Sequence, residues 1–204
     1  MHSRWFARVA RVSLVTVKTE LANRLWSDDE LLALPENKFW QLIDGELIKM
    51  SPAGAEHGEI CSRLLITVGL FVRRRKLGRV YDSSTGFRLD PENCFSGDVS
   101  FVKTDRVASV LPNPEKFVQG APDFAIEVLS PTDTIRSIER KIELFFKFGT
   151  PLMWFVLPRK RLVRVYTGAK DYATFDLSGT LSAEPVLAGL SIPVREVFED
   201  PAFD

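Results

Sequence analysis

Apolar residues along this chain alternate between strand-like runs and helix-like spacings, which predicts an α/β fold. The clearest run covers residues 124–129, where apolar residues surround a single carboxylate, Glu127. A strand that is buried on both faces reads as a continuous apolar run, so we predict a central strand here. Ser130 and Pro131 break the run. Apolar residues then recur at the spacing of one helical face, at Ile135, Ile138, Ile142, Phe145 and Phe146.

The amino-terminal half predicts a β-hairpin followed by a long helix. Strand-like runs at 39–43 and 46–50 flank Asp44-Gly45, a pair typical of a two-residue hairpin turn. Apolar residues at helical spacing then predict a helix over 55–76, for which Gly78 is the expected stop.

The start of the chain differs in character from the rest. Residues 1–20 are rich in arginine, hold one acid, Glu20, and lack the apolar segment and cleavage site of a targeting peptide. We predict a disordered extension at 1–20 and a single domain at 21–204. Ser27 and Glu30 form a capping-box pattern, and we expect the folded region to begin there.

Shorter runs complete the predicted elements. Strands are expected at 79–81, 85–89, 99–102, 152–157, 162–166 and 171–177. Residues 105–120 contain Pro112 and Pro114 and predict a loop. The tail at 185–198 offers apolar residues for docking and predicts a short final helix.

Composition narrows the functional classes. The 204 residues are 45% hydrophobic and 26% charged, with a net charge of zero, so any affinity for a polyanion must come from local patches. Two cysteines, Cys61 and Cys94, cannot form a disulfide framework, and no Cys/His metal spacing is recognised, which fits a cytoplasmic protein. No apolar run approaches the roughly 18 residues that a membrane span needs, so no membrane partner is expected.

Glu127 places a carboxylate inside a strand that is predicted to be buried. A carboxylate inside a buried strand is costly unless a cation or hydrogen bonds stabilise it. Lys141 flanks the apolar stripe of the following helix and can reach along the sheet towards Glu127. Two interpretations stay open: a structural ion pair between these side chains, or a site in which Glu127 also binds a metal ion.

Asp98 adds a second carboxylate at the start of the preceding predicted strand. Carboxylates on adjacent strands can share one divalent cation, and Mg²⁺ suits this arrangement because it takes one or two carboxylates and keeps several waters. Together with Lys141, the pair Asp98 and Glu127 has the groups that metal-dependent phosphodiester hydrolysis requires.

Several ordered blocks of the sequence carry a more specific signal. They read WQLIDGELIKMSPAGAEHGEI, FSGDVSFV, APDFAIEVLSPTD, ERKIELFFKFGTPLMWFVLP and, in the tail, PVLAGLSIPVREVF. They resemble the Uma-two family of predicted endonucleases, which belongs to the PD-(D/E)XK restriction-endonuclease-like superfamily. The resemblance implies an α/β fold with a restriction-endonuclease-like core, a mixed central β-sheet flanked by helices, and an N-terminal β-hairpin. It also implies a metal-dependent endonuclease, a phosphodiester hydrolase whose partner is DNA.

The same resemblance assigns roles to individual residues. Asp98 and Glu127 are the implied catalytic acids that bind the metal, with Mg²⁺ as cofactor and Mn²⁺ as a substitute. Many members of the superfamily carry a lysine two residues after the glutamate, where this chain has Leu129; Lys141 matches that lysine moved onto the following helix. His57 matches a position that is usually histidine and is expected to line the same pocket. The alternative for His57 is a helix-terminal residue with local hydrogen bonds only.

Two positions depart from the family pattern. The residue before the strand aspartate is usually proline and is Gly97 here, which we expect to loosen the approach to Asp98. The family favours glutamate at the position of Gln41, so this chain keeps the oxygen and loses the charge, which weakens the case for metal affinity. Asp44 is predicted to serve the hairpin turn, while Glu46 can face either way.

Local basic groups provide candidate contacts to nucleic-acid phosphates. They are Arg73 to Lys76, Arg136, Arg140, and the turn Arg159-Lys160-Arg161. For Arg73 to Lys76 we favour ordinary charge at a helix carboxyl end. The alternative function is a catalytically silent relative that binds nucleic acid or protein, and a third is a hydrolase of another phosphate ester. A homodimer is a further expectation from the resemblance.

Overall fold

A computed structural model describes residues 24–131 and 133–199 of the chain. The extension predicted at 1–20 lies outside these residues. The helices in the described part are α2 (Asp28–Leu32), α3 (Ala55–Arg75), α4 (Thr104–Val110), α5 (Ile135–Lys147) and α6 (Val194–Phe198), with 3-10 turns η1 (Asn37–Phe39) and η2 (Pro158–Lys160). The strands are β1 (Trp40–Ile43), β2 (Glu46–Lys49), β3 (Gly78–Asp82), β4 (Phe87–Asp90), β5 (Asn93–Phe95), β6 (Val99–Lys103), β7 (Val118–Gln119), β8 (Phe124–Val128), β9 (Met153–Leu157), β10 (Leu162–Tyr166), β11 (Tyr172–Phe175), β12 (Thr180–Ser182) and β13 (Ser191–Pro193).

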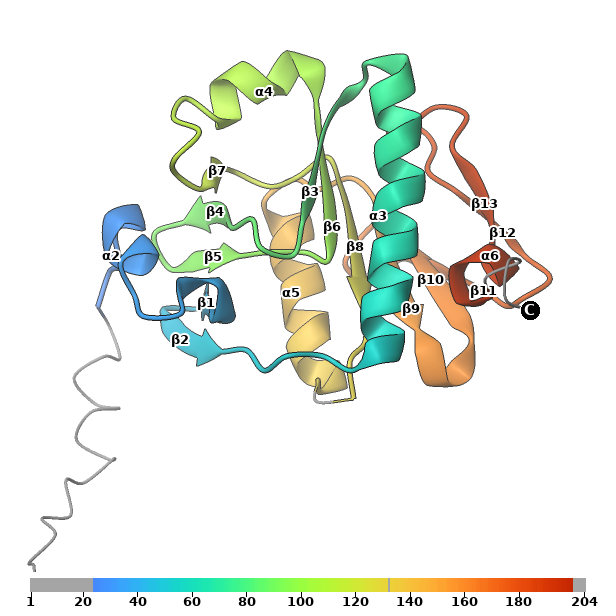
Figure 1. The fold of residues 1–204 in the computed structure, drawn as a ribbon, viewed down its shortest axis with the longest axis horizontal. Coiled ribbons are helices and arrows are strands. Elements are labelled where there is room, and N and C mark those ends of the chain that lie inside the picture. The colour runs from blue at the N-terminus through green and yellow to red at the C-terminus, as the bar shows by residue number, and fades with distance from the viewer. Residues whose placement is uncertain (1–23, 132, 200–204) are drawn as a thin grey trace, which may run out of the picture.

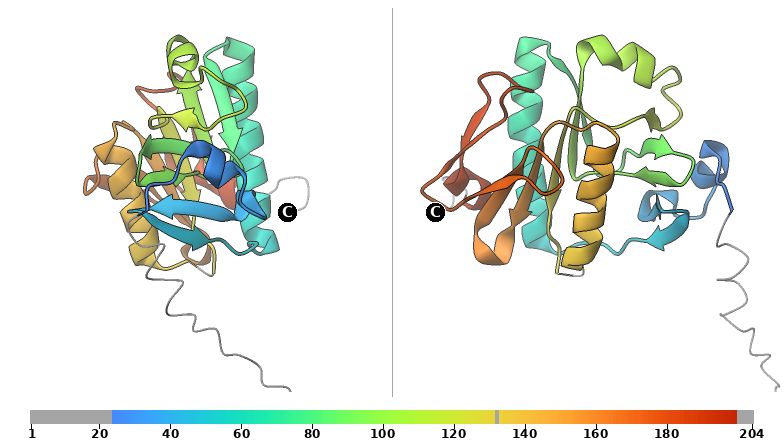
Figure 2. Two further views of the ribbon diagram at one scale, coloured as in Figure 1. Left: turned by 90° about the vertical axis from the view of Figure 1, so that its left-hand side faces the viewer. Right: turned by 180° about the vertical axis from the view of Figure 1, so that it is seen from behind.

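The largest sheet is mixed and six-stranded, in the order β11-β10-β9-β8-β6-β3. Strands β8 and β9 run parallel, and β8 pairs antiparallel with β6. Helix α3 covers one face and α5 the other, as the views in Figures 1 and 2 show. The predicted mixed central sheet flanked by helices is therefore confirmed.

Alternation along β8 explains why its sequence is almost wholly apolar. Phe124, Ile126 and Val128 pack in the core that α3 covers. Ala125 packs in the core that α5 covers, and Glu127 follows it on the same face because side chains alternate along a strand. The carboxylate of Glu127 is thereby directed towards α5.

A second sheet of five strands, in the order β2-β1-β5-β4-β7, contains the predicted N-terminal hairpin. Asp44 and Gly45 form its two-residue turn, with φ of 51° and 78°. Both angles lie in the left-handed region that such hairpin turns require, which is why Asp-Gly is the pair found here. The hairpin is confirmed, and β2 is an edge strand of this sheet.

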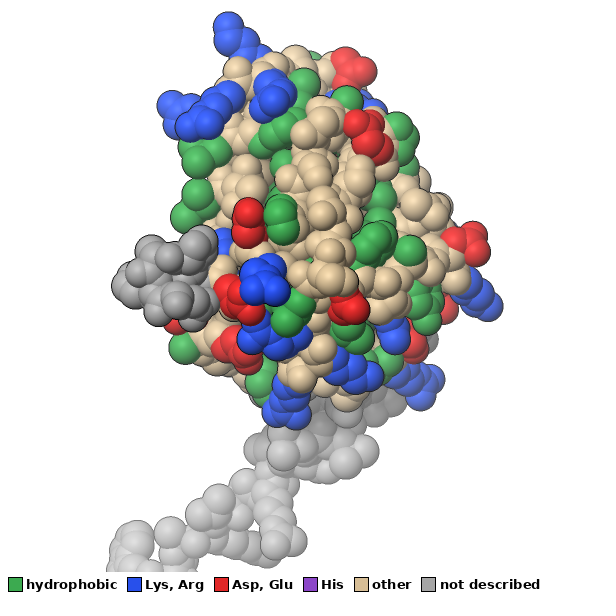
Figure 3. Space-filling view, turned by 90° about the vertical axis from the view of Figure 1, so that its right-hand side faces the viewer, with side chains coloured by type: hydrophobic (Ala, Val, Ile, Leu, Met, Phe, Trp, Pro, Cys, Tyr) green, Lys and Arg blue, Asp and Glu red, His purple; other side chains and the backbone are tan. Residues whose placement is uncertain are grey.

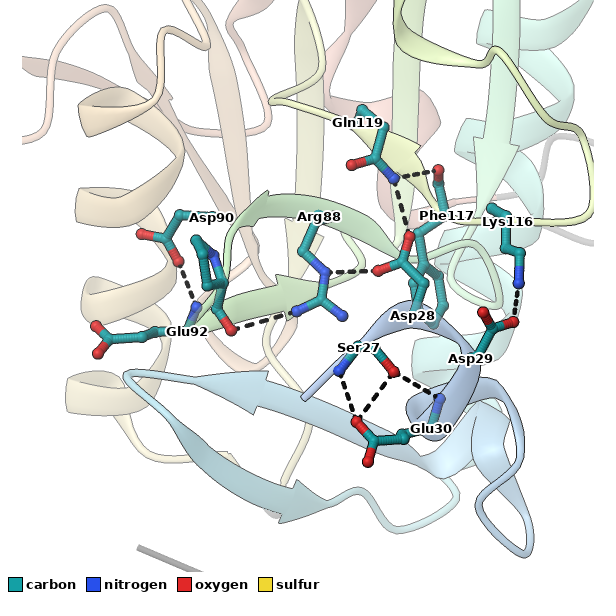
Figure 4. A network of polar contacts seen from close by, with 11 residues as sticks. Ser27, Asp28, Asp29, Glu30, Arg88, Asp90, Glu92, Lys116, Phe117 and Gln119 are labelled. Atoms are coloured by element: carbon teal, nitrogen blue, oxygen red, sulfur yellow. Dashed lines mark hydrogen bonds and ion pairs between the residues drawn. The ribbon is translucent and has the colours of Figure 1, made fainter. Parts of the chain in front are cut away.

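A polar network attaches α2 to the second sheet (Figure 4). Ser27 and Glu30 form the predicted capping box at the start of α2. The buried guanidinium of Arg88 on β4 donates to Asp28 over 2.8 Å, and Gln119 on β7 donates to the same carboxylate over 3.0 Å. Behind these contacts lies a small apolar cluster of buried residues, Trp26, Leu31, Leu42 and Cys94.

Two local predictions were wrong. The segment 105–120, expected to be a loop, contains α4 and β7. The short helix precedes the prolines, and burial of Val110 stabilises it. This stabilisation comes from tertiary packing, so the local sequence does not predict it. Gly78 does not stop α3: the helix ends at Arg75, and Lys76 adopts the left-handed cap with φ of 56°. Gly78 instead begins β3, where a Cβ would lie 2.0 Å from the carbonyl oxygen of Val102.

The carboxyl-terminal part follows the prediction, with additions. The short final helix is α6, and the hairpin strands β12 and β13 before it were not expected. Basic side chains gather at the end of α3, where Arg73, Arg74 and Arg75 form its last turn (Figure 3). Among the helices of the described residues, none is long and apolar enough to cross a bilayer.

Candidate active site

A cleft of about 440 Å³ opens where the amino ends of α3 and α5, the start of β6 and the end of β8 meet the N-terminal hairpin. Figure 1 shows the amino ends of α3 and α5 at the lower edge of the molecule. All four site residues expected from the sequence line this cleft: His57, Asp98, Glu127 and Lys141. Gln41, at the position where the family favours an acid, lines it as well.

Glu127 and Lys141 form a buried ion pair. Lys141 Nζ lies 2.5 Å from Glu127 Oε1, and the two side chains are 8% and 4% exposed, respectively. Apart from this ion pair, Oε1 accepts no hydrogen bond from the described residues. Burial raises the pKa of Glu127 to about 7, against the lowering effect of the Lys141 ammonium. The carboxyl group is therefore short of stabilising partners for its charged form.

Asp98 is held against β8 by two backbone hydrogen bonds. Its amide donates to the carbonyl of Ile126 over 3.0 Å, and its Oδ2 accepts from the amide of Val128 over 2.7 Å. The preceding residue, Gly97, is buried, and a Cβ there would lie 3.0 Å from Ser100 Oγ. Tight packing thus surrounds the glycine that was expected to loosen this approach.

The two carboxylates are close enough to influence each other. The charge of Asp98 is among the causes that raise the pKa of Glu127. Two hard oxygen donors that face one cleft, one of them buried beside Lys141, form a donor set that suits a divalent cation. The residues therefore fit the metal that a restriction-endonuclease-like site implies.

His57 lies in the first turn of α3 and faces Asp98. Its Nε2 is 3.5 Å from Asp98 Oδ2, and both side chains are 14% exposed. The hydrogen bond to Asp98 raises the pKa of His57, although partial burial acts in the opposite direction. The contact crosses from helix to sheet, so a purely local role for this histidine is not what the structure shows.

Gln41 is tied into the wall of the cleft. It is buried on β1, and its Nε2 donates to Ser96 Oγ over 3.3 Å. Ser96 in turn donates to the carbonyl of Ser83 over 2.7 Å. Gln41 therefore presents a neutral amide to the cleft, and its hydrogen bond to Ser96 fixes the orientation of that amide.

Cys61 also lies at this site, although the sequence did not predict it. Among the described residues, one group of three or more His, Cys, Asp and Glu side chains brings its ligand atoms within 4.8 Å of one another: His57, Cys61 and Asp98. Cys61 Sγ lies 3.5 Å from His57 Nδ1. The spacing of four residues on one helix was the available signal, because it places both side chains on the same face.

Several charged residues considered for other roles are engaged elsewhere. Arg140 donates to both oxygens of Asp44 over 2.7 and 2.6 Å, which gives Asp44 the predicted structural role at the turn. Arg161 pairs with Glu199. Arg140 and Arg161 are thus already neutralised, and Glu46 is exposed.

Both the sequence and the structure resemble known proteins. A family model described as "Uma2: Putative restriction endonuclease" matches residues 28–195. Among solved structures, a protein of Anabaena variabilis ATCC 29413 described as a putative nuclease belonging to DUF820 superposes with a TM-score of 0.73 at 21% identity. The match covers 85% of this chain and 97% of that one, which shows a common fold. No curated protein matches the sequence.

Proposed function

Because this chain belongs to the Uma2 family, we propose that it is an endonuclease that hydrolyses phosphodiester bonds in DNA with Mg²⁺ as cofactor. One observation carries the proposal: the buried Glu127, paired with Lys141, shares a cleft with the carboxylate of Asp98. A structural ion pair alone has no need of a second carboxylate or of an open cleft beside it.

Each side chain has a distinct task in this proposal. Asp98 and Glu127 would hold the cation, which would polarise the phosphodiester and lower the pKa of a water molecule at the site. Lys141 directs a positive charge into the cleft, where it stabilises the negative charge that develops on the phosphate oxygens. His57, whose pKa is raised by Asp98, keeps that carboxylate in place and adds positive charge when protonated.

Lys141 reaches Glu127 from a different element, although the two residues are far apart in the sequence. The residue two places after Glu127 is Leu129, which packs against the apolar core under α5. Lys141 comes from α5 itself and reaches the same carboxylate from above the sheet. An ammonium group therefore stands beside the glutamate although the strand supplies no lysine.

Metal binding and cleavage together test the proposal. Calorimetric titration of Mg²⁺ and Mn²⁺ into the protein is compared with Glu127→Gln and Asp98→Asn, and the same samples are assayed on plasmid and single-stranded DNA. Glu139→Gln, an exposed acid on α5, is the matched control. We expect binding and cleavage in the parent and control only. Absence of metal binding by the folded parent would refute the proposal.

A homodimer and a cytoplasmic location stay predictions, and light scattering on the purified protein checks the first. Binding of DNA without cleavage in the presence of either metal would favour the silent binding module over the enzyme.

A further inference from the structure

The cluster of His57, Cys61 and Asp98 has the dimensions of a tetrahedral metal site. His57 Nε2 lies 3.5 Å from Asp98 Oδ2 and 3.8 Å from Cys61 Sγ. With bonds of about 2.0–2.1 Å to nitrogen or oxygen and about 2.3 Å to sulfur, tetrahedral geometry separates such ligands by about 3.3–3.6 Å. Both of these separations lie within a few tenths of an ångström of those values, and the ligand atoms of all three residues lie within 4.8 Å of one another.

The architecture favours the same conclusion. His57 and Cys61 are separated by one turn of the long helix α3, so their relative position is set by a regular element. Asp98 is held by the backbone of β8 through Val128. Three ligands of different types thus meet at a junction of helix and sheet, and each of them is partly buried.

The donor set selects a different metal from the one proposed for catalysis. Imidazole and thiolate ligands suit zinc and related transition metals, whereas Mg²⁺ prefers oxygen ligands alone. Three protein ligands leave the fourth tetrahedral position to water. Binding at Cys61 releases the thiol proton, because the thiolate is the form that ligates a metal.

We propose that His57, Cys61 and Asp98 form a second metal site, which takes Zn²⁺ or a similar transition metal, and that its occupancy excludes Mg²⁺ because Asp98 serves both sites. The binding part stands by itself, while the inhibitory part rests on the proposed nuclease function. Zn²⁺ is then an inhibitor of Mg²⁺-dependent cleavage, and sensitivity to it depends on Cys61, a residue with no role in the proposed reaction.

The decisive experiment uses Co²⁺ as a spectroscopic probe of the full chain. A tetrahedral site with a thiolate ligand gives strong visible bands and a sulfur-to-cobalt charge-transfer band in the near ultraviolet. We expect these bands in the parent and in Glu127→Gln, which lacks an acid of the catalytic site only. Cys61→Ser should lose the charge-transfer band, with Zn²⁺ affinity lowered at least about 100-fold.

Two controls make the result specific. Cys94→Ala removes the other cysteine, which is buried near Trp26 and Leu42 away from the cleft, and should leave the band intact. Cys61→Ala repeats the test with a smaller side chain, in case the serine variant does not fold. A parent protein without a charge-transfer band, or a band that persists in both Cys61 variants, would overturn the proposal.

DNA cleavage assays in the presence of Zn²⁺ test the metal site separately from the proposed nuclease function. Zn²⁺ at low concentration should inhibit Mg²⁺-dependent cleavage by the parent and leave Cys61→Ser active. Equal inhibition of both proteins refutes the exclusion of Mg²⁺ through Asp98. If no DNA is cleaved under any condition, the nuclease function fails while the Co²⁺ spectra still decide the metal site.

Discussion

Replacing Lys141 by methionine should move the pH dependence of metal binding upwards. Methionine keeps much of the length and apolar surface of the lysine stem and removes the ammonium that lies 2.5 Å from Glu127. Because burial already raises the pKa of Glu127 to about 7, the ammonium is the main group that keeps part of this carboxyl ionised at neutral pH. Without it, Glu127 should hold its proton to higher pH.

The size of the effect follows from the proximity of the charges. An opposite charge within a few ångströms lowers a carboxyl pKa by about 1–3 units, so the pKa of Glu127 should rise by a similar amount when the ammonium is removed. At a pH below the raised pKa, each unit of increase lowers the ionised fraction by about tenfold. The cation binds the ionised carboxylate, so apparent Mg²⁺ affinity should fall by a similar factor.

The direction of the effect can be tested from the pH at which Lys141→Met and the parent protein bind Mg²⁺ equally well. A carboxyl group with a raised pKa gives up its proton late, so affinity for the cation increases as pH rises through that pKa and is constant above it. Lys141→Met should therefore bind Mg²⁺ more weakly than the parent near pH 7. Its affinity should recover at pH values above the raised pKa of Glu127, where the carboxylate is ionised and no ammonium repels the cation.

Two measurements on the same samples test this reasoning. Carbon-13 NMR of the glutamate carboxyl groups follows Glu127 in the metal-free protein, and calorimetry measures Mg²⁺ and Mn²⁺ affinity from pH 6 to pH 9. Lys147→Met, which removes an exposed lysine from the same helix, is the control. An unchanged Glu127 midpoint, or a loss of affinity that is the same at every pH, would refute the argument.

Further substitutions probe other parts of the structure. Arg88→Met leaves Asp28 without its buried partner and should lower the free energy of unfolding by about 3–5 kcal/mol, measured by urea denaturation. Gln41→Glu adds a negative charge to the wall of the cleft and should raise Mg²⁺ affinity in calorimetry; an unchanged or lower affinity would show that this side chain does not face the cation. Gly78→Ala places a Cβ against the carbonyl of Val102 and should cost more than the roughly 1 kcal/mol of an average substitution, seen as a lower melting temperature.

The central pairing in the site could be predicted from local sequence. A carboxylate within an apolar strand requires a nearby cation, and the helix that follows β8 offers Lys141 at the edge of its apolar stripe. The structure confirms this contact. The roles of Asp98 and Glu127 as metal ligands and of His57 in catalysis stay predictions, which the titrations and cleavage assays described above test.

Other features depend on tertiary packing and could not be predicted from the local pattern of residues, although the family resemblance predicted that His57 lines the pocket. Asp98 approaches His57 only because β6 pairs with β8 and α3 packs on that sheet, contacts between residues far apart in the sequence. Cys61 looks like an ordinary helical residue until Asp98 is placed opposite it. The helix α4 and the strand β7 form in a segment whose prolines favour a loop, since burial of Val110 and Val118 outweighs local preference.

The edge strand β2 is the most weakly packed part of the wall that the hairpin provides to the cleft. Strand β2 lies at a sheet edge without one fully buried residue, whereas every residue of β8 is buried. Local opening costs the least free energy where few apolar contacts are lost, so amide hydrogens of β2 should exchange with solvent well before those of β8. Glu127 therefore lies on the strand that opens last, and the edge strand β2 forms the side of the cleft that opens first.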